Sequence, residues 1–246
     1  MLKKLKRKIL TQAIYSASRK AGKKSLVKMI GGLKRVSRIE DQARIDFIIK
    51  ALEANHPMVN FIKKLTTQRS KKSIKKFMEN LIVRGLLENV KVREAAFEKG
   101  EGVPATLLIS PSMRCNLRCV GCYANEYNKA DDLPFEVLDK LMNEGRDLGI
   151  GFYTILGGEP FVRKDLFKLF KKHNDLYFQV FTNSTLITEE VCKKLKKLGN
   201  VMLQISIEGW EKETDERRGK GTYAKIMKAM DLLNKYGLPF GCSTCV

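Results

Sequence analysis

The first hundred residues carry apolar side chains at helical spacing. From residue 1 to residue 20, apolar residues recur every three or four positions, with lysines and arginines between them. This stripe consists of Leu2, Leu5, Ile9, Ala13 and Ala17. The spacing predicts an amphipathic helix. Further helices are predicted over about 39–55, ending before a His-Pro pair that disfavours helix, and in the segments around 61–65 and 74–82.

The pattern changes after the Gly/Pro-rich segment 100–104, which is typical of a linker or turn. Beyond it, short apolar runs alternate with longer amphipathic segments. The runs predict strands over 105–110, 151–156, 176–182 and 201–207, and a fifth strand that begins near residue 239. The segments between them predict helices over 134–149, 164–173 and 223–236, and another that Thr188 caps. Such alternation predicts βα units around a parallel sheet, either open or closed into a barrel.

Charge separates the same two regions. The whole chain has a net charge of +20. Residues 1–100 contain 26 Lys+Arg and 8 Asp+Glu, a net of +18, whereas residues 101–246 contain 21 and 19, a net of +2. We therefore expect a basic helical region over 1–100 and an α/β region over 101–246. The six cysteines are too sparse for a disulfide scaffold, and no apolar run has membrane-spanning length. These features favour a cytoplasmic protein, and peripheral association with a membrane is the alternative.

Residues with chemical potential follow the predicted strands. The carboxyl ends of parallel strands are where α/β proteins collect their functional groups. The candidates in chain order are Cys115, Cys119 and Cys122 after the first strand, Gly157-Gly158-Glu159-Pro160 after the second, Thr182-Asn183 after the third, and Gln204, Ser206 and Glu208 on the fourth. The last three share one face because side chains alternate along a strand. A bound polar ligand would give partners to these buried polar groups.

Three thiols within eight positions indicate a soft or borderline metal centre, either zinc or iron–sulfur. Structural zinc takes four protein ligands, and an iron–sulfur cube normally takes four cysteines. Another pair, Cys242 and Cys245, lies on the predicted fifth strand, where its two side chains would point to opposite faces. Three cysteines leave one metal position open. Spacing alone does not decide between zinc and an iron–sulfur cluster.

The combination of motifs resembles the radical S-adenosylmethionine (radical SAM) superfamily. The motifs are Cys-x3-Cys-x2-Cys after the first strand, GGEP after the second, TNST after the third, and SIEG followed by ETDERRGKGTY after the fourth. The last two resemble the branch of SPASM-type, peptide- and cofactor-maturing enzymes. The resemblance covers residues 105–246 and implies a partial (β/α) TIM-like barrel. Such barrels usually have six βα units, whereas about four and a half are present here, so we expect the core over 101–246 to be truncated within the fifth strand.

The resemblance also implies roles for single residues. Cys115, Cys119 and Cys122 would hold three irons of a [4Fe–4S] cluster, and S-adenosylmethionine would bind the fourth. The residues implied to bind S-adenosylmethionine are Gly157, Gly158, Glu159 and Pro160 near the methionine amino group, Thr182 and Asn183 near the methionine or ribose, Ser206 and Glu208 near the ribose, Arg218 near the carboxylate and Tyr123 near the adenine. Gly121 stands where the family often has an aromatic residue before the third cysteine.

The implied activity is that of a radical SAM enzyme. The reduced cluster would cleave S-adenosylmethionine to a 5′-deoxyadenosyl radical, which abstracts hydrogen from a peptide, a cofactor precursor or a lipid. An electron donor such as ferredoxin or flavodoxin would be a partner. The alternative is a non-catalytic module that holds zinc or a degenerate cluster, with a basic arm that docks to a membrane or a nucleic acid.

The basic helices over 1–100 have three interpretations. They are a solvated surface, a docking face for an anionic membrane, or a nucleic-acid contact. Tyr15 is the only aromatic residue before Phe47, so base stacking has little support and nucleic acid is the least favoured partner.

Overall fold

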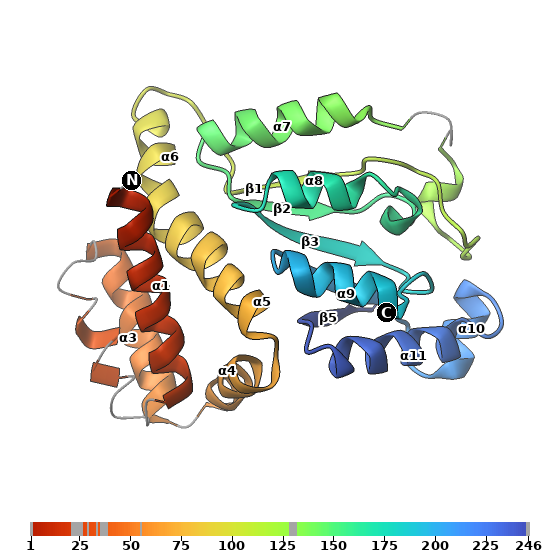
Figure 1. The fold of residues 1–246 in the computed structure, drawn as a ribbon, viewed down its shortest axis with the longest axis horizontal. Helices are drawn as coiled ribbons and strands as arrows, with labels where there is room; N and C mark the ends of the chain where they lie inside the picture. The colour runs from red at the N-terminus through yellow and green to blue at the C-terminus, as the bar shows by residue number, and fades with distance from the viewer. Residues whose placement is uncertain are drawn as a thin grey trace.

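The computed structural model describes residues 2–20, 27–28, 30–32, 34, 39–54, 56–127 and 132–244. Its centre is a parallel sheet of five strands in the order β1-β2-β3-β4-β5 (Figure 1). The strands are β1 (Thr106–Ile109), β2 (Phe152–Ile155), β3 (Tyr177–Thr182), β4 (Val201–Ser206) and β5 (Phe240–Ser243). All five strand predictions are confirmed. Each neighbouring pair is parallel, so the chain crosses over through a helix between strands.

Helices on one side of the sheet complete the βα units (Figure 1). They are α7 (Phe135–Asp147), α8 (Leu166–Lys172), α9 (Glu189–Leu198), α10 (Glu211–Arg218) and α11 (Thr222–Lys235). The Thr188 side chain accepts a hydrogen bond from the Val191 amide, which confirms the predicted cap of α9. Helix α10 is not one of the helices that the sequence predicts. Two short 3₁₀ turns, η2 (Tyr123–Asn125) and η3 (Pro160–Val162), lie in the loops after β1 and β2.

The main core lies between the sheet and these helices. One face of strands β1 to β4 supplies buried residues, among them Ile155, Val180 and Ile205, and the helices supply residues such as Leu138 and Leu195. The opposite, inner face of the sheet is polar near its middle. There the Thr154 hydroxyl donates to Gln179 at 3.4 Å, and the Gln179 side chain donates to Gln204 at 3.3 Å. The two faces follow from the period-two alternation of the strands.

The residues before β1 are helical in every segment that the structure describes as regular. They form α1 (Leu2–Lys20), α3 (Ile39–Glu53), α4 (Pro57–Gln68), α5 (Lys71–Lys76), the π-helical segment η1 (Phe77–Glu88) and α6 (Asn89–Phe97). In Figure 1 these helices lie beside the amino ends of the strands, away from the loops after β1 and β2. No helix among the described residues is both long and apolar enough to span a bilayer.

Segment η1 attaches the helical region to the amino end of the sheet. The Asn80 amide donates to the carbonyl oxygens of Asn174 and Leu176 at 3.0 and 2.9 Å, just before β3. Arg84 forms an ion pair with Asp175. π-Helical segments are rare and place side chains off the ordinary helical register. Hydrophobic spacing does not predict them, and the sequence indicated only a helix here.

His173 is buried beside this attachment and is neutral. Its Nδ1 lies 2.6 Å from Arg146 Nη2, and its Nε2 lies 2.9 Å from Asp139 Oδ1. An arginine only donates, so Nδ1 accepts and the proton on Nε2 is donated to Asp139. Burial lowers the pKa of His173 below its ordinary value of 6.5, against the raising effect of Asp139. His173, at the C-terminus of α8, therefore carries no charge there at neutral pH.

This arrangement predicts a loss of stability in mild acid. Below about pH 6.5 the unfolded chain binds a proton at this histidine while the folded protein does not, so the free energy of unfolding falls as the pH drops toward the folded pKa. Urea unfolding at several pH values should show a smaller decline for His173→Gln than for the natural protein. His56→Gln, at an exposed histidine, is the matched control and should keep the full decline. Equal slopes for the natural protein and His173→Gln would contradict the assignment.

Candidate functional site

The three clustered cysteines lie in the loop that follows β1. Cys115, Cys119 and Cys122 are all partly buried and line one cavity of about 310 Å³. The same cavity is lined by Gly157 and Gly158 after β2 and by residues at the carboxyl ends of β3 and β4. The structure thus brings together the ends of four strands, as a parallel α/β fold predicts. The cysteine loop and the GGEP segment are thus separate in the sequence but adjacent in the folded chain.

Backbone contacts fix the shape of the cysteine loop. The Val120 amide donates to the Arg217 carbonyl oxygen at 2.8 Å, which ties the loop to α10. The Asn125 side chain donates to the Cys119 carbonyl oxygen at 3.1 Å. These bonds use main-chain atoms of the loop and leave the cysteine side chains available to the cavity.

The sulfur of Cys115 already accepts two weak hydrogen bonds. The donors are the Leu117 amide at 3.4 Å and the Asn183 side-chain nitrogen at 3.7 Å. Burial raises the pKa of the Cys115 and Cys119 thiols above their ordinary value, although the positive charge of Arg218 acts in the opposite direction on Cys119. N–H groups directed at sulfur are the kind of contact that tunes thiolate ligands in iron–sulfur proteins.

The GGEP segment is interlocked with the chain just before the first cysteine. The Gly158 amide donates to the Ser112 carbonyl oxygen at 3.0 Å, and the Glu159 amide donates to the Arg114 carbonyl oxygen at 2.9 Å. A Cβ atom on Gly158 would lie 2.2 Å from the Arg114 carbonyl oxygen. Gly157 has a φ of 110°, a conformation that side chains rarely allow. Two glycines are therefore required for the two loops to approach this closely.

The carboxylate of Glu159 is buried inside this junction and does not line the cavity. It is 1% exposed and accepts hydrogen bonds from the Phe161 amide at 3.1 Å, the Thr182 hydroxyl at 2.8 Å and the Asn183 amide at 2.8 Å. Burial raises its pKa, while the three donors lower it. The structure thus places Glu159 differently from the resemblance, which implies a charge near the methionine amino group. Here it joins the loop after β2 to the end of β3.

Thr182 and Asn183 take part in the same junction. The Thr182 hydroxyl is used by Glu159, and the Asn183 side chain donates to Cys115 Sγ and, at 3.0 Å, to the Asn116 side-chain oxygen. Both residues reach the cavity wall. These contacts hold protein groups in position. Pro160, which the resemblance implies lies near S-adenosylmethionine, is buried as the first residue of η3.

Glu208 lies between two arginines at the end of β4. Its carboxylate accepts from Arg218 Nε at 2.5 Å and Nη2 at 2.6 Å, and from Arg217 Nη1 at 2.7 Å. Burial opposes its ionisation, but Arg218 and Arg217 hold its pKa below the usual value. The expected ribose contact of Glu208 therefore competes with a two-arginine ion pair. Both arginines line the cavity.

Arg217 is a site residue that the sequence reasoning missed. Its side chain pairs with Glu208, and its carbonyl oxygen holds the Val120 amide of the cysteine loop. The signal that could have found it is the helical spacing of the ETDERR segment, which would have placed it on α10. Asp215, in the same segment, accepts from the Gly221 and Tyr223 amides at 2.6 and 2.8 Å and so fixes the start of α11.

The remaining expected residues lie at the cavity. Ser206 and Tyr123 both line it, and the Tyr123 hydroxyl donates to the Gly157 carbonyl oxygen at 3.2 Å. Apolar residues of the inner sheet face, Leu108 and Phe181, also line it and were not singled out from the sequence. Period-two alternation could have identified them. Cys242 is exposed on β5, and Cys245 lies outside the described residues.

The donor set fits a cluster of several metal atoms. Within the described part of the chain, no three His, Cys, Asp or Glu side chains converge on a point where one metal ion could bind. The three cysteine side chains nevertheless border one cavity that Gly157 and Gly158 also line, and the Cys115 sulfur accepts two N–H donors. Several cysteine thiolates around one space are the ligands that an iron–sulfur cluster takes.

Comparison with known families gives a match over the α/β part of the chain. The profile of the Radical SAM superfamily matches residues 109–246. An uncharacterized protein of Methanocaldococcus jannaschii is 34% identical over 154 residues, which are 57% of this chain and 52% of that protein. The AdoMet-dependent heme synthase of Methanosarcina barkeri is 32% identical, over 54% of this chain and 40% of the synthase. The PqqA peptide cyclase of Granulibacter bethesdensis is 33% identical, over 55% and 38%.

Solved structures give a similar result. Native anSMEcpe with bound AdoMet (S-adenosylmethionine) is 28% identical with a TM-score of 0.50, over 56% of this chain and 42% of that one. SuiB of Streptococcus suis, in a complex with its precursor peptide SuiA, is 23% identical with a TM-score of 0.55, over 64% and 37%, a likeness in fold. The chain spans about half or less of the length of the curated relatives described here.

Proposed function

Because the chain belongs to the radical SAM superfamily, we propose that it is a radical SAM enzyme whose [4Fe–4S] cluster is bound by Cys115, Cys119 and Cys122. The expected α/β fold of a partial barrel is confirmed, and the motifs occur in the expected order on the expected elements. When bound, the cluster and S-adenosylmethionine supply an electron and a 5′-deoxyadenosyl radical that abstracts hydrogen from the substrate. One observation carries the proposal: the three thiols share a single cavity with the glycines after β2 and with Arg218.

The residues of this chain would orient S-adenosylmethionine from several sides. The Gly157 carbonyl oxygen accepts one hydrogen bond from Tyr123 and has a second lone pair for the methionine amino group. Arg218 uses Nε and Nη2 on Glu208, and its remaining N–H groups are suited to the methionine carboxylate. The Ser206 hydroxyl would bind the ribose. Glu208 then acts mainly by fixing the direction of Arg218.

Other residues would keep the cluster ligands in place. Glu159 joins the GGEP loop to the end of β3, and Asn183 donates to the Cys115 sulfur. Arg217 holds the cysteine loop through its carbonyl oxygen. These groups restrict the motion of the loop and are expected to slow solvent access. We assign them a positioning role.

The substrate class follows from the relatives and the shape of the sheet. The relatives include a peptide cyclase and a heme synthase, so we propose a peptide or a cofactor precursor, with a lipid as the third class. The inner face of the sheet beside the cavity mixes Leu108 and Phe181 with Thr154. Such a surface suits a substrate that has both apolar and polar parts. A low-potential donor such as ferredoxin or flavodoxin would reduce the cluster.

We also propose a division of the chain into two domains. Residues 101–246 would form the radical SAM core, and residues 1–100 a separate helical domain. In support, the family match begins at residue 109, after the last residue of α6. The contacts from η1 to the segment before β3 would form the interface between them.

Anaerobic reconstitution with iron and sulfide tests the proposed activity. We expect about four irons per chain and an electron paramagnetic resonance signal of the reduced cluster that changes when S-adenosylmethionine is added. The reduced protein should then form 5′-deoxyadenosine. Ser206→Ala should leave the iron content unchanged and raise the Kd for S-adenosylmethionine by about threefold to tenfold, because it removes one hydrogen bond.

The alternative of a zinc module gives a different result in the same experiment. Stoichiometric zinc without a cluster, after anaerobic purification and reconstitution, would contradict the radical SAM proposal for this chain. A cluster signal that S-adenosylmethionine does not change would contradict the open-iron part of the proposal.

A further inference from the structure

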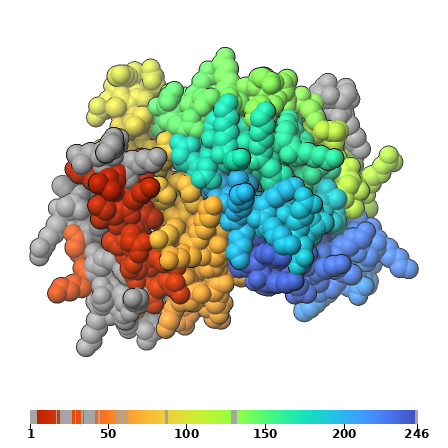
Figure 2. All heavy atoms as spheres, in the orientation of Figure 1, coloured from red at the N-terminus to blue at the C-terminus, as the bar shows by residue number. Residues whose placement is uncertain are grey.

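Helix α1 exposes apolar side chains of the kind that an amphipathic helix ordinarily buries. Leu5, Ile9 and Leu10 are 56%, 62% and 37% exposed. The side of α1 that packs on the protein instead carries Thr11 and Tyr15, which are 5% and 4% exposed. In Figure 2 the side chains of α1 lie on the surface of the molecule.

An ion pair explains why α1 has this orientation. Arg7 lies on the packed side and binds both carboxylate oxygens of Glu88 on η1, with Nε 3.1 Å from each. Tyr15 completes the same side by packing with Ile74 and Met78. A bidentate arginine pair fixes rotation as well as distance. The outer face of α1, defined here as Leu5, Lys6, Lys8, Ile9, Leu10 and Ala13, is therefore held away from the core.

Helix α1 belongs to a strongly basic part of the sequence. Residues 1–39 contain no acidic residue, and residues 1–100 have a net charge of +18. Lys6 and Lys8 are exposed on or beside the apolar stripe, and neither makes a hydrogen bond or an ion pair with any residue that the structure describes. A helix face that exposes leucine and isoleucine beside these lysines is complementary to a surface that offers both apolar groups and negative charges.

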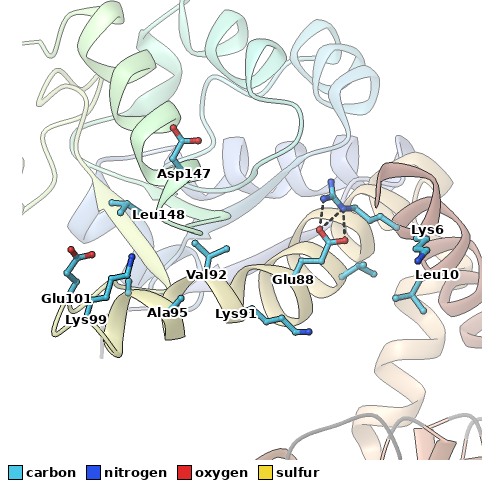
Figure 3. A pocket seen from close by; sticks show the side chains of 13 residues that line it. Lys6, Leu10, Glu88, Lys91, Val92, Ala95, Lys99, Glu101, Asp147 and Leu148 are labelled. Atoms are coloured by element: carbon cyan, nitrogen blue, oxygen red, sulfur yellow. Dashed lines mark hydrogen bonds and ion pairs between the residues drawn. The ribbon is translucent and has the colours of Figure 1, made fainter. Parts of the chain in front are cut away.

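A cavity of about 800 Å³ continues from the outer face of α1. Lys6 and Leu10 form one end of it, and Lys99 and Glu101 form the other (Figure 3). Between them, apolar side chains such as Val92 of α6 line the wall. Leu148, which directly follows α7, is exposed and also lines this cavity. The apolar surface available beside α1 is thus larger than the helix alone provides.

We propose that the outer face of α1 docks the protein onto an anionic phospholipid membrane. The helix would lie in the plane of the interface, with Leu5, Ile9 and Leu10 among the upper acyl chains and the lysines at the phosphates. The adjoining cavity would accommodate part of a lipid at the rim of this contact. This docking is independent of the proposed radical chemistry.

The position of α1 leaves the cysteine cavity clear of the membrane. The larger cavity is bordered by Asp147 and Leu148 at the end of α7, just before the amino end of β2. The cysteines follow the carboxyl end of β1, at the opposite end of the parallel strands (Figure 1). Docking therefore holds the protein at a surface without covering the site.

Two other occupants of this face have less support. A nucleic acid would use the charge, but the outer face of α1 has no aromatic side chain for base stacking and leaves its leucine and isoleucine unexplained. A second copy of this chain would bring an equally basic surface to the contact, because an isologous interface places the same patch on both sides. Repulsion between the two patches disfavours that pairing.

Vesicle flotation of the purified full chain tests the proposal. We expect binding to phosphatidylcholine vesicles that contain about one third phosphatidylglycerol, little binding to pure phosphatidylcholine, and loss of binding in about 1 M salt. Leu5→Gln with Ile9→Gln, and separately Lys6→Gln with Lys8→Gln, should each weaken binding at least about tenfold. All four positions are exposed, so the variants should fold, and Arg7 remains to hold α1.

Matched changes on the opposite part of the molecule provide the controls. Lys225→Gln with Lys228→Gln makes the same charge change on α11, and Val137→Gln with Met227→Gln makes a comparable apolar change on α7 and α11. Both controls should bind vesicles like the natural protein. Equal losses in the test and control variants would overturn the proposal, because net charge or general hydrophobicity would then explain binding.

Further outcomes would also overturn it. These are equal binding to anionic and neutral vesicles, binding of a single-stranded oligonucleotide but no vesicles, or a dimer in solution that the Leu5→Gln and Ile9→Gln pair converts to monomer. Each result would show that the outer face of α1 binds a nucleic acid or a second copy of the chain, or that it has no preference for an anionic membrane.

Discussion

Replacing Cys119 by alanine is expected to abolish cluster binding and lower the rate of 5′-deoxyadenosine formation by at least about a thousandfold. A cluster held by three cysteines loses one of its protein ligands, and no fourth cysteine borders the cavity among the described residues. The Cys119 main chain makes the hydrogen bonds that shape the loop, and alanine keeps them. The variant should therefore fold normally. Iron and sulfide content, together with the resonance spectrum, measure the loss.

Cys242→Ala is the matched control for this experiment. Cys242 is exposed on β5 and does not line the cysteine cavity. Its replacement should leave the iron content, the spectrum and product formation unchanged. If Cys119→Ala retains a full cluster, or if Cys242→Ala loses it, the ligand assignment is wrong.

Gly158→Ala is expected to disrupt the site without touching a metal ligand. Its Cβ would lie 2.2 Å from the Arg114 carbonyl oxygen and 2.7 Å from the Met113 carbonyl oxygen. Since backbone atoms cannot rotate away, the chain that leads to Cys115 must move. We expect a loss of about 1–3 kcal/mol in the free energy of unfolding and a severe loss of cluster loading. Urea unfolding and iron content after reconstitution measure the two effects.

The control for this substitution is Gly102→Ala. No atom lies within 4 Å of a Cβ built on Gly102, and the residue precedes β1. Its free energy of unfolding should change by no more than about 0.5 kcal/mol, and its iron content should not change. Gly158→Ala with normal iron loading would show that the close approach of the two loops is not required for the site.

The strand–helix alternation after residue 104 was sufficient to predict the sheet and its helices. The short apolar runs predicted the strands in the right places, because local spacing determines which side chains can share a buried face. The cysteine spacing and the GGEP segment predicted where the site lies, since parallel strands place their carboxyl ends together. These features depend on near neighbours in the sequence and on one topological rule.

The direction in which single polar groups point was not predictable in the same way. Glu159 was expected to face a ligand, yet its carboxylate is satisfied by two amides and a hydroxyl from segments 2 to 24 residues away. Arg217 was not singled out from the sequence, yet it pairs with Glu208. A buried charge turns toward whichever donors the folded chain places around it, and those donors come from other elements.

Helix α1 shows the same division between sequence and structure. Its spacing determined that residues 2–20 are helical and that one side is apolar. Which side packs on the protein was decided by Glu88 of η1, which binds Arg7 across 81 residues of sequence. The sequence by itself thus determined the elements, their faces and the place of the cysteines. Only the tertiary structure decided which charged groups are paired and which apolar face remains exposed, because pairing depends on distances between segments that sequence spacing does not contain.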